Sequence, residues 1–157
     1  GRTATGVRGI SMKDASDEVV GMICVSDLNH NVLVVSEHGY GKQSSLEDYR
    51  ITNRGGKGVK TINVTEKTGS LIAILEVTGL DDLMIITKRG TLIRLGIENL
   101  RVMGRATQGV RLINLKNNDT IAAIAKVPAE LTEQTDENPE GQAPESNNES
   151  GNPESGE

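Results

Sequence analysis

Two basic positions recur three times in this chain, six residues apart within each copy. The first position holds Arg2, Arg54 and Arg105, and the second holds Arg8, Lys60 and Arg111. Successive copies lie 52 and 51 residues apart, so the sequence has a period of about 51 residues, which indicates an array of repeated structural units. Lys and Arg bind phosphate groups through charge and hydrogen bonds. Each unit is expected to present one such pair, and together the pairs predict a basic stripe suited to a phosphate backbone.

The three copies span residues 1–10, 53–62 and 104–113 and share a glycine two places before the second cation. The middle copy contains the loop Gly55-Gly56-Lys57-Gly58, whose backbone amides could approach phosphates closely. Other basic residues complete the candidate set for nucleic-acid contact, which is Arg2, Arg8, Lys42, Arg50, Arg54, Lys57, Lys60, Arg94, Arg105 and Arg111. The simpler alternative is a set of solvated turn residues that keep a sheet soluble.

The charge of the chain is divided unevenly between a body and a tail. Residues 129–157 contain nine acidic side chains and no Lys or Arg, whereas residues 1–128 contain 17 basic and 13 acidic side chains, a net charge of +4. The tail is also rich in Pro, Gly, Ser and Asn and has little apolar surface to bury, so we expect it to be disordered. The basic body predicts a polyanionic partner.

Several functions are disfavoured by composition. Phe and Trp are absent and Tyr occurs twice, which leaves almost no aromatic platform for base stacking. Cys24 is the single cysteine; it fits a reducing compartment, and its apolar neighbours predict a buried thiol. No nucleophile with a neighbouring base, no cluster of metal ligands and no apolar run long enough for a membrane helix is apparent. We therefore expect neither catalysis nor a cofactor site within this segment.

Short segments rich in β-branched residues, separated by turns, predict an all-β fold. They fall into two sets of four with the same order and spacing, at residues 19–25, 31–36, 41–44 and 59–64, and then at 71–77, 83–87, 91–95 and 110–115. Gly39 and Gly90 are expected to have positive φ in hairpin turns. The sequence Ser44-Ser45-Leu46-Glu47 predicts a helical turn. Each set should form a four-stranded unit.

A ninth segment, residues 121–127, repeats the opening strand of a unit without further strands after it. It should pair with a neighbouring unit, because a lone strand would leave its backbone groups unpaired. The chain begins with Gly rather than Met, and two units and a fraction cannot close a ring. We therefore expect this chain to be the C-terminal piece of a longer protein.

Three ordered motifs resemble the C-terminal domains of the gyrase and topoisomerase IV A-subunit family. They are Gly-Tyr-Gly-Lys at 39–42, Arg-Gly-Gly-Lys-Gly-Val at 54–59 and Met-Gly-Arg-Ala-Thr-Gln-Gly-Val at 103–110. The resemblance covers residues 1–128 and implies a β-pinwheel, a propeller-like disc of four-stranded blades that exchange strands with their neighbours. This chain would supply the last two blades and part of another, followed by the acidic tail at 129–157.

The resemblance also implies a function, namely wrapping of double-stranded DNA by a non-catalytic domain of the gyrase A subunit. The holoenzyme would be an ATP-dependent type II topoisomerase that pairs this polypeptide with the gyrase B subunit in a heterotetramer in the bacterial cytoplasm, at the nucleoid. ATP and magnesium would bind elsewhere in that assembly. The family box Gln-Arg-Arg-Gly-Gly-Lys-Gly is not intact here, because Thr52 and Asn53 replace its first two residues. Two alternatives remain, the A subunit of topoisomerase IV and a propeller-like scaffold that binds an acidic protein.

Overall fold

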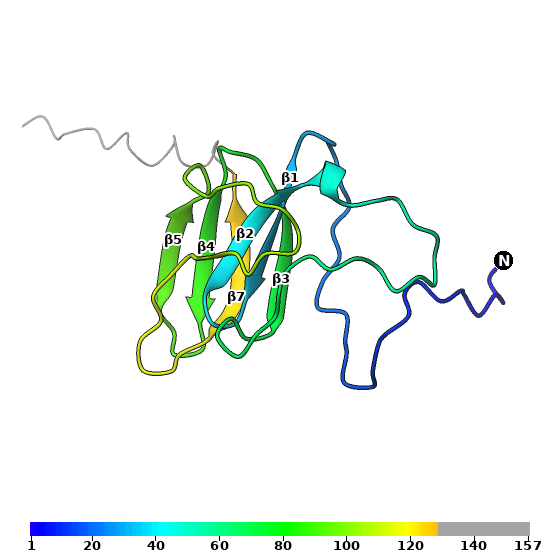
Figure 1. Ribbon diagram of the computed structural model, residues 1–157, viewed down its shortest axis with the longest axis horizontal. Helices are drawn as coiled ribbons and strands as arrows, with labels where there is room; N and C mark the ends of the chain where they lie inside the picture. Colours follow the sequence, from blue (N-terminus) through cyan, green and yellow to red (C-terminus); the bar gives the residue numbers. More distant parts are fainter. Residues whose placement is uncertain (129–157) are drawn as a thin grey trace, which may run out of the picture.

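The computed structural model of the chain describes residues 1–128, which form seven β-strands and one short 3₁₀ helix (Figure 1). The elements are β1 (Asn31–Ser36), β2 (Tyr40–Ser45), η1 (Leu46–Asp48), β3 (Leu71–Val77), β4 (Asp82–Thr87), β5 (Leu92–Gly96), β6 (Val110–Arg111) and β7 (Ile121–Val127). The predicted all-β fold is confirmed. The prediction of a disordered tail falls on residues outside the described part. No helix within residues 1–128 has the length and apolar character needed to span a bilayer.

The strands form two antiparallel sheets, with orders β3-β1-β2-β6 and β5-β4-β7. Each sheet contains a strand that belongs to the following repeat. β3 opens the second unit yet pairs with β1 of the first, and β7 likewise pairs with β4. The expected pairing of residues 121–127 with a neighbouring unit is therefore confirmed, and the blades exchange strands.

The main core lies between the two sheets and is built almost entirely from aliphatic side chains. Its buried members are Leu33, Val35, Val77, Leu83, Ile85, Ile97, Ile113 and Ile121. The other face of β1 is also covered, because Val32 and Val34 pack against Ile62 in a second cluster. Burial on both faces explains why β1 reads as a continuous apolar run rather than an alternating one. The sheets are thereby fixed relative to each other, and the loops that carry the cations extend from them.

Two predicted strands do not form, and a third is shorter than predicted. Residues 19–25 and 59–64 contain no strand, and within 110–115 only the first two residues form β6. A strand needs a partner for its backbone N–H and C=O groups. β3 and β7 lie one and two periods after residues 19–25 and pair with β1 and β4; an equivalent partner for residues 19–25 is not among the described residues. The residue types of these segments indicate a tendency to form strands, but they do not show whether a partner strand is present.

Cys24 lies in one of these strandless segments and is exposed, so the prediction of a buried thiol is wrong. Its apolar neighbours would have buried it only if residues 19–25 had formed a covered strand. The turn predictions are confirmed, because Gly39 and Gly90 have φ of 82° and 84°. The predicted helical turn is η1, and the Ser45 side chain accepts a hydrogen bond from the Glu47 amide at its start.

Candidate nucleic-acid interface

Successive copies of the ten-residue segment lie side by side and are joined by the same hydrogen bond. The Ser11 amide donates to the Gly56 carbonyl over 2.9 Å, and the Asn63 amide donates to the Thr107 carbonyl over 2.9 Å. Ser11 and Asn63 each follow directly after a copy, whereas Gly56 and Thr107 hold the fourth place of the next copy. We call these contacts the first seam (residues 8–11 with 54–56) and the second seam (residues 60–63 with 105–107).

The seams bring together cations from successive copies. At the second seam an Arg105 Nη1 hydrogen lies towards the Lys60 carbonyl, with a donor–acceptor distance of 3.4 Å. Both residues line one pocket of about 490 Å³, which Asp48 also lines. Arg8 and Arg54 hold the equivalent places at the first seam and are exposed. At the second seam the basic positions of two successive copies therefore meet, Lys60 from one copy and Arg105 from the next.

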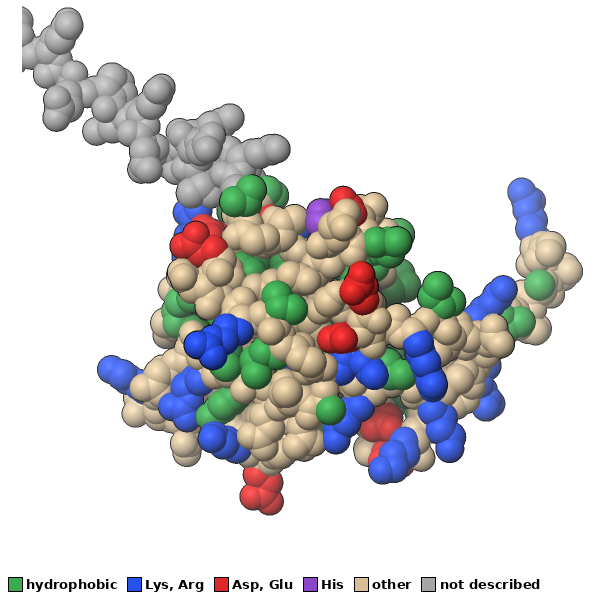
Figure 2. Space-filling model, turned by 45° about the horizontal axis from the view of Figure 1, so that its top comes forward, with side chains coloured by type: hydrophobic (Ala, Val, Ile, Leu, Met, Phe, Trp, Pro, Cys, Tyr) green, Lys and Arg blue, Asp and Glu red, His purple; other side chains and the backbone are tan. Residues whose placement is uncertain are grey.

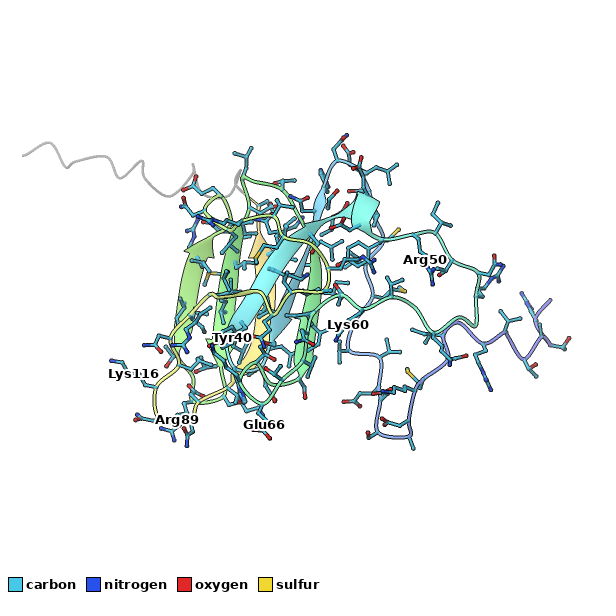
Figure 3. The ribbon with its side chains drawn as sticks, viewed as in Figure 1. Tyr40, Arg50, Lys60, Glu66, Arg89 and Lys116 are labelled. Carbon is cyan, nitrogen blue, oxygen red and sulfur yellow. The ribbon has the colours of Figure 1, made fainter. Side chains whose placement is uncertain are left out.

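Figure 2 shows one face of the molecule. Its Lys and Arg side chains gather mostly along the lower part of this face and on the N-terminal arm, and its Asp and Glu side chains lie mainly above them. Arg50 lies on the loop that leaves η1, and Lys60 lies where the chain returns towards the sheets (Figure 3). Arg50, Arg54 and Lys57 are exposed. Within residues 1–128 none of these three forms an ion pair with a carboxylate. Their charges are therefore available to an anionic ligand.

Lys42 does not belong to this surface, and its assignment to nucleic-acid contact is wrong. The residue is completely buried in β2, and its ammonium group donates hydrogen bonds to the carbonyls of Gly104 and Arg105. Desolvation by burial lowers the pKa of this amine. Lys42 acts as a clamp on the third copy rather than as a contact with a ligand.

Two neighbouring side chains of β2 extend this clamp. Gln43 Nε2 donates to the Leu100 carbonyl over 2.9 Å, and Ser44 Oγ donates to the Met103 carbonyl over 2.7 Å. The Met103 amide in turn donates to the Gln43 carbonyl over 2.8 Å. These buried polar groups are satisfied by the backbone of the loop that precedes the third copy. They fix the position of Arg105 relative to the sheet.

Three further candidate contacts, Arg105, Arg2 and Arg94, have different surroundings. The Arg105 guanidinium carbon lies 5.9 Å from the centre of the Tyr49 ring, within cation–π distance. Arg2 is exposed in the first copy, outside the first seam. Arg94 lies on β5 of the second sheet, where its Nε contacts Asp82 Oδ2 over 2.6 Å. The structure does not bring Arg94 to either seam.

Arg111 holds the place of Lys60 in the third copy but has a different setting. Its Nη2 donates to the Tyr40 hydroxyl over 2.8 Å, and Lys67 Nζ lies 5.5 Å from the centre of the same ring. Neither Tyr40 nor Lys67 is among the nucleic-acid contacts that the sequence predicts. The 51-residue repeat does not indicate these two residues, because the equivalent positions one repeat later hold Thr91 and Asn118.

Nearly all of the described residues match one known protein family. Residues 1–26, 30–78 and 81–128 match the family described as "DNA gyrase C-terminal domain, beta-propeller". The A subunit of DNA gyrase from Staphylococcus aureus strain NCTC 8325 is 47% identical over 138 residues, which are 87% of this chain and 15% of that protein. Its counterpart from strain MRSA252 is 46% identical, over 87% of this chain and 16% of its own length. The chain thus spans about 15% of the length of these relatives.

Solved structures share the fold. The C-terminal domain of DNA topoisomerase IV superposes with a TM-score of 0.72 at 18% identity, covering 80% of this chain and 39% of that one. The C-terminal domain of DNA gyrase A has a TM-score of 0.58 at 26% identity, over 62% and 33% of the two chains. The first likeness shows the fold alone, since its identity is low. The predicted propeller-like β-pinwheel is confirmed, and the chain belongs to the family of DNA gyrase C-terminal domains.

Proposed function

We propose that residues 1–128 form a non-catalytic segment of a gyrase A subunit that binds double-stranded DNA and wraps it. The observation that carries this proposal is the repeated seam, which joins successive copies by the same backbone hydrogen bond and, at the second seam, sets Lys60 beside Arg105. A solubilising role for these residues would not require the same backbone bond and the same basic positions at both seams. The 47% identity to the gyrase A polypeptide supports gyrase over topoisomerase IV.

Wrapping requires that many weak contacts offset the stiffness of the duplex. Bending 20–30 base pairs by 40–90° costs about 1–6 kcal/mol. Cations that contact phosphates along the row would supply this energy and carry no base specificity. Affinity should therefore fall steeply with salt, by roughly 10³–10⁵ between 50 and 200 mM for a surface making 6–10 phosphate contacts.

In the whole enzyme this segment would serve an ATP-dependent type II topoisomerase that introduces negative supercoils. The wrap would present a second duplex segment to the strand-passage gate with a chosen handedness. The gyrase B subunit would complete a heterotetramer, and ATP and magnesium would bind in other parts of it. DNA as the substrate implies that the enzyme works in the bacterial cytoplasm at the nucleoid.

The proposal is tested by measuring duplex affinity against salt for the native full-length protein and for a variant with Arg54, Lys57 and Lys60 all changed to Ala. We expect weaker binding and a salt slope reduced by about 0.9 for each phosphate that is no longer neutralised. Lys60→Ala alone should also weaken binding, whereas Lys126→Ala should not, because Asp81 already lies 3.8 Å from the Lys126 ammonium. Unchanged affinity in the triple variant would favour the protein-interaction scaffold.

A further inference from the structure

A pocket of about 400 Å³ lies beside the turn between β1 and β2. Three parts of the chain form it, namely this turn, the turn that precedes β3 and the segment between β6 and β7. The polar residues that line it are His38, Tyr40, Lys67, Arg111, Asn114, Asn118, Asp119 and Thr120. We call it the tyrosine pocket. Figure 3 shows Tyr40 on the same side of the sheets as Glu66 and Lys116.

Two cations meet at Tyr40. The Arg111 guanidinium carbon lies 5.4 Å from the centre of the ring, and its Nη2 and Nε lie 2.8 and 3.3 Å from the hydroxyl oxygen. Lys67 Nζ lies 5.5 Å from the same centre. Neither cation forms an ion pair with a carboxylate of residues 1–128. Two like charges held around one ring, neither of them in an ion pair, favour the binding of an anion.

Both cations retain donors for a ligand. A guanidinium has five N–H groups, and Arg111 directs one from each nitrogen to Tyr40 and Asn114. Two of its N–H groups and the Lys67 ammonium remain for an anion. Asp119 adds one negative charge to the lining, but its Oδ1 accepts from the amides of Arg89 and Thr120 over 3.3 and 2.8 Å. With His38 neutral, the formal charge of the lining remains positive.

We propose that the tyrosine pocket binds one phosphate group of duplex DNA, with Arg111 and Lys67 as the donors. This inference rests on the proposed function. Arg111 holds the same repeat position as Lys60, so the pocket continues the basic row of the seams by one repeat. The lowered pKa of Tyr40, which its hydrogen bond from Arg111 chiefly causes, agrees with a positive potential in the pocket. Because Thr91 and Asn118 replace Tyr40 and Lys67 one repeat later, this repeat would grip the duplex more strongly than the next.

The test compares Lys67→Gln with Lys116→Gln in the native full-length protein, using duplex binding measured between 50 and 200 mM salt. Both lysines are exposed, so both variants should fold, and each loses one charge; Lys116 lies outside the tyrosine pocket. Lys67→Gln should lower the salt slope by about 0.9 and reduce the affinity several-fold, as expected when one phosphate is no longer neutralised. Arg111→Gln should do the same. Equal effects of Lys67→Gln and Lys116→Gln would overturn the proposal.

A second measurement identifies the source of the phosphate. Equilibrium dialysis with radiolabelled inorganic phosphate measures occupancy of the pocket without DNA, and added duplex should displace the bound phosphate from the wild type. Phosphate that remains bound while DNA binds, with no loss of DNA affinity in Lys67→Gln, would mean a free anion and would contradict the assignment to DNA. A wild-type protein that binds no DNA would refute the proposed function, whereas specific phosphate binding in that protein would still uphold the pocket as an anion site.

Discussion

The loops of the second and third copies have similar sequences but very different surroundings. The second loop (residues 53–58) contacts the first copy through the Gly55 amide, which donates to the Gly9 carbonyl over 2.8 Å. The residues directly after this loop, 59–64, form no strand. The third loop (residues 104–109) is clamped by Lys42 and leads directly into β6. The repeated segment therefore specifies glycines and cations, whereas a neighbouring β2 is needed to turn its end into a strand.

The largest expected effect comes from changing the shared glycine of the copies. Gly6 and Gly109 both have positive φ, at 84° and 76°. A Cβ on Gly109 would lie 2.5 Å from the Gly41 carbonyl oxygen, whereas a Cβ on Gly6 would meet nothing within 4 Å. Gly6→Ala should cost at most about 1–2 kcal/mol from left-handed strain. Gly109→Ala should cost about 1–3 kcal/mol more, because the backbone must also move apart.

The two alanine variants are compared by thermal or denaturant unfolding of the full-length protein, with amide exchange to locate the change. The amide of Leu112, which donates to the Gly39 carbonyl over 2.8 Å, should exchange faster in Gly109→Ala alone. Equal destabilisation by both substitutions would mean that the third copy is not packed more tightly than the first.

A somewhat smaller effect is expected from Lys42→Met, which keeps an unbranched side chain as far as Cε and removes the ammonium group. The carbonyls of Gly104 and Arg105 would lose their buried donor, at a cost of about 1–3 kcal/mol. The third loop should become mobile while the second loop is unchanged, as measured by amide exchange. Lys116→Met serves as the control, since Lys116 is exposed. If DNA affinity fell with no loss of stability, Lys42 would instead be a direct contact.

The smallest effect concerns the turn that joins the strandless segment 19–25 to β1. Glu76 Oε1 accepts from the Ser26 amide over 2.8 Å and also contacts Asp27 N and His30 Nδ1. The hydrogen bond from the Ser26 amide is the main reason that the pKa of Glu76 falls to about 2. Its contribution to stability is therefore present above the ordinary pKa of about 4.5 and disappears only as the pH falls through about 2.

Glu76→Gln should therefore expose the amides of Ser26 and Asp27 to faster exchange at pH 7. The difference from the wild type should be full above about pH 4.5 and close between about pH 4.5 and 2. The comparison is made between variant and wild type at each pH, so that the effects of charges common to both proteins cancel. A difference that is already absent at pH 5 would show that the carboxylate does not hold this turn.

Much of the architecture could be predicted because local signals were strong. The aliphatic runs at β1 and β4, the hairpin glycines and the 51-residue period indicate repeated antiparallel units without reference to any partner. The absence of strands at residues 19–25 and 59–64 could not be predicted in this way, because propensity describes a single segment whereas a β-ladder also needs a second strand. The exposure of Cys24 follows from the same missing information.

The spacing of the cations was visible in the sequence, but their surroundings were not. The cations at Lys60 and Arg105 were visible from their spacing, but only the fold shows that a seam joins them across two copies. Lys42 carries the same charge as the exposed lysines, and its sequence neighbours do not reveal that two carbonyls lie within reach of its amine. Tyr40 and Lys67 come from turns far apart in the sequence, and no repeat of their types marks them.

Wrapping by the basic row is tested most directly by ligating nicked circular DNA in the presence of the native full-length protein. After protein removal, the distribution of linking numbers reports both the extent of wrapping and its handedness. We predict a shift in a single direction that grows with protein concentration and diminishes when Arg54, Lys57 and Lys60 are changed to Ala. A distribution identical to that of DNA ligated without protein would contradict the proposed role of the seams.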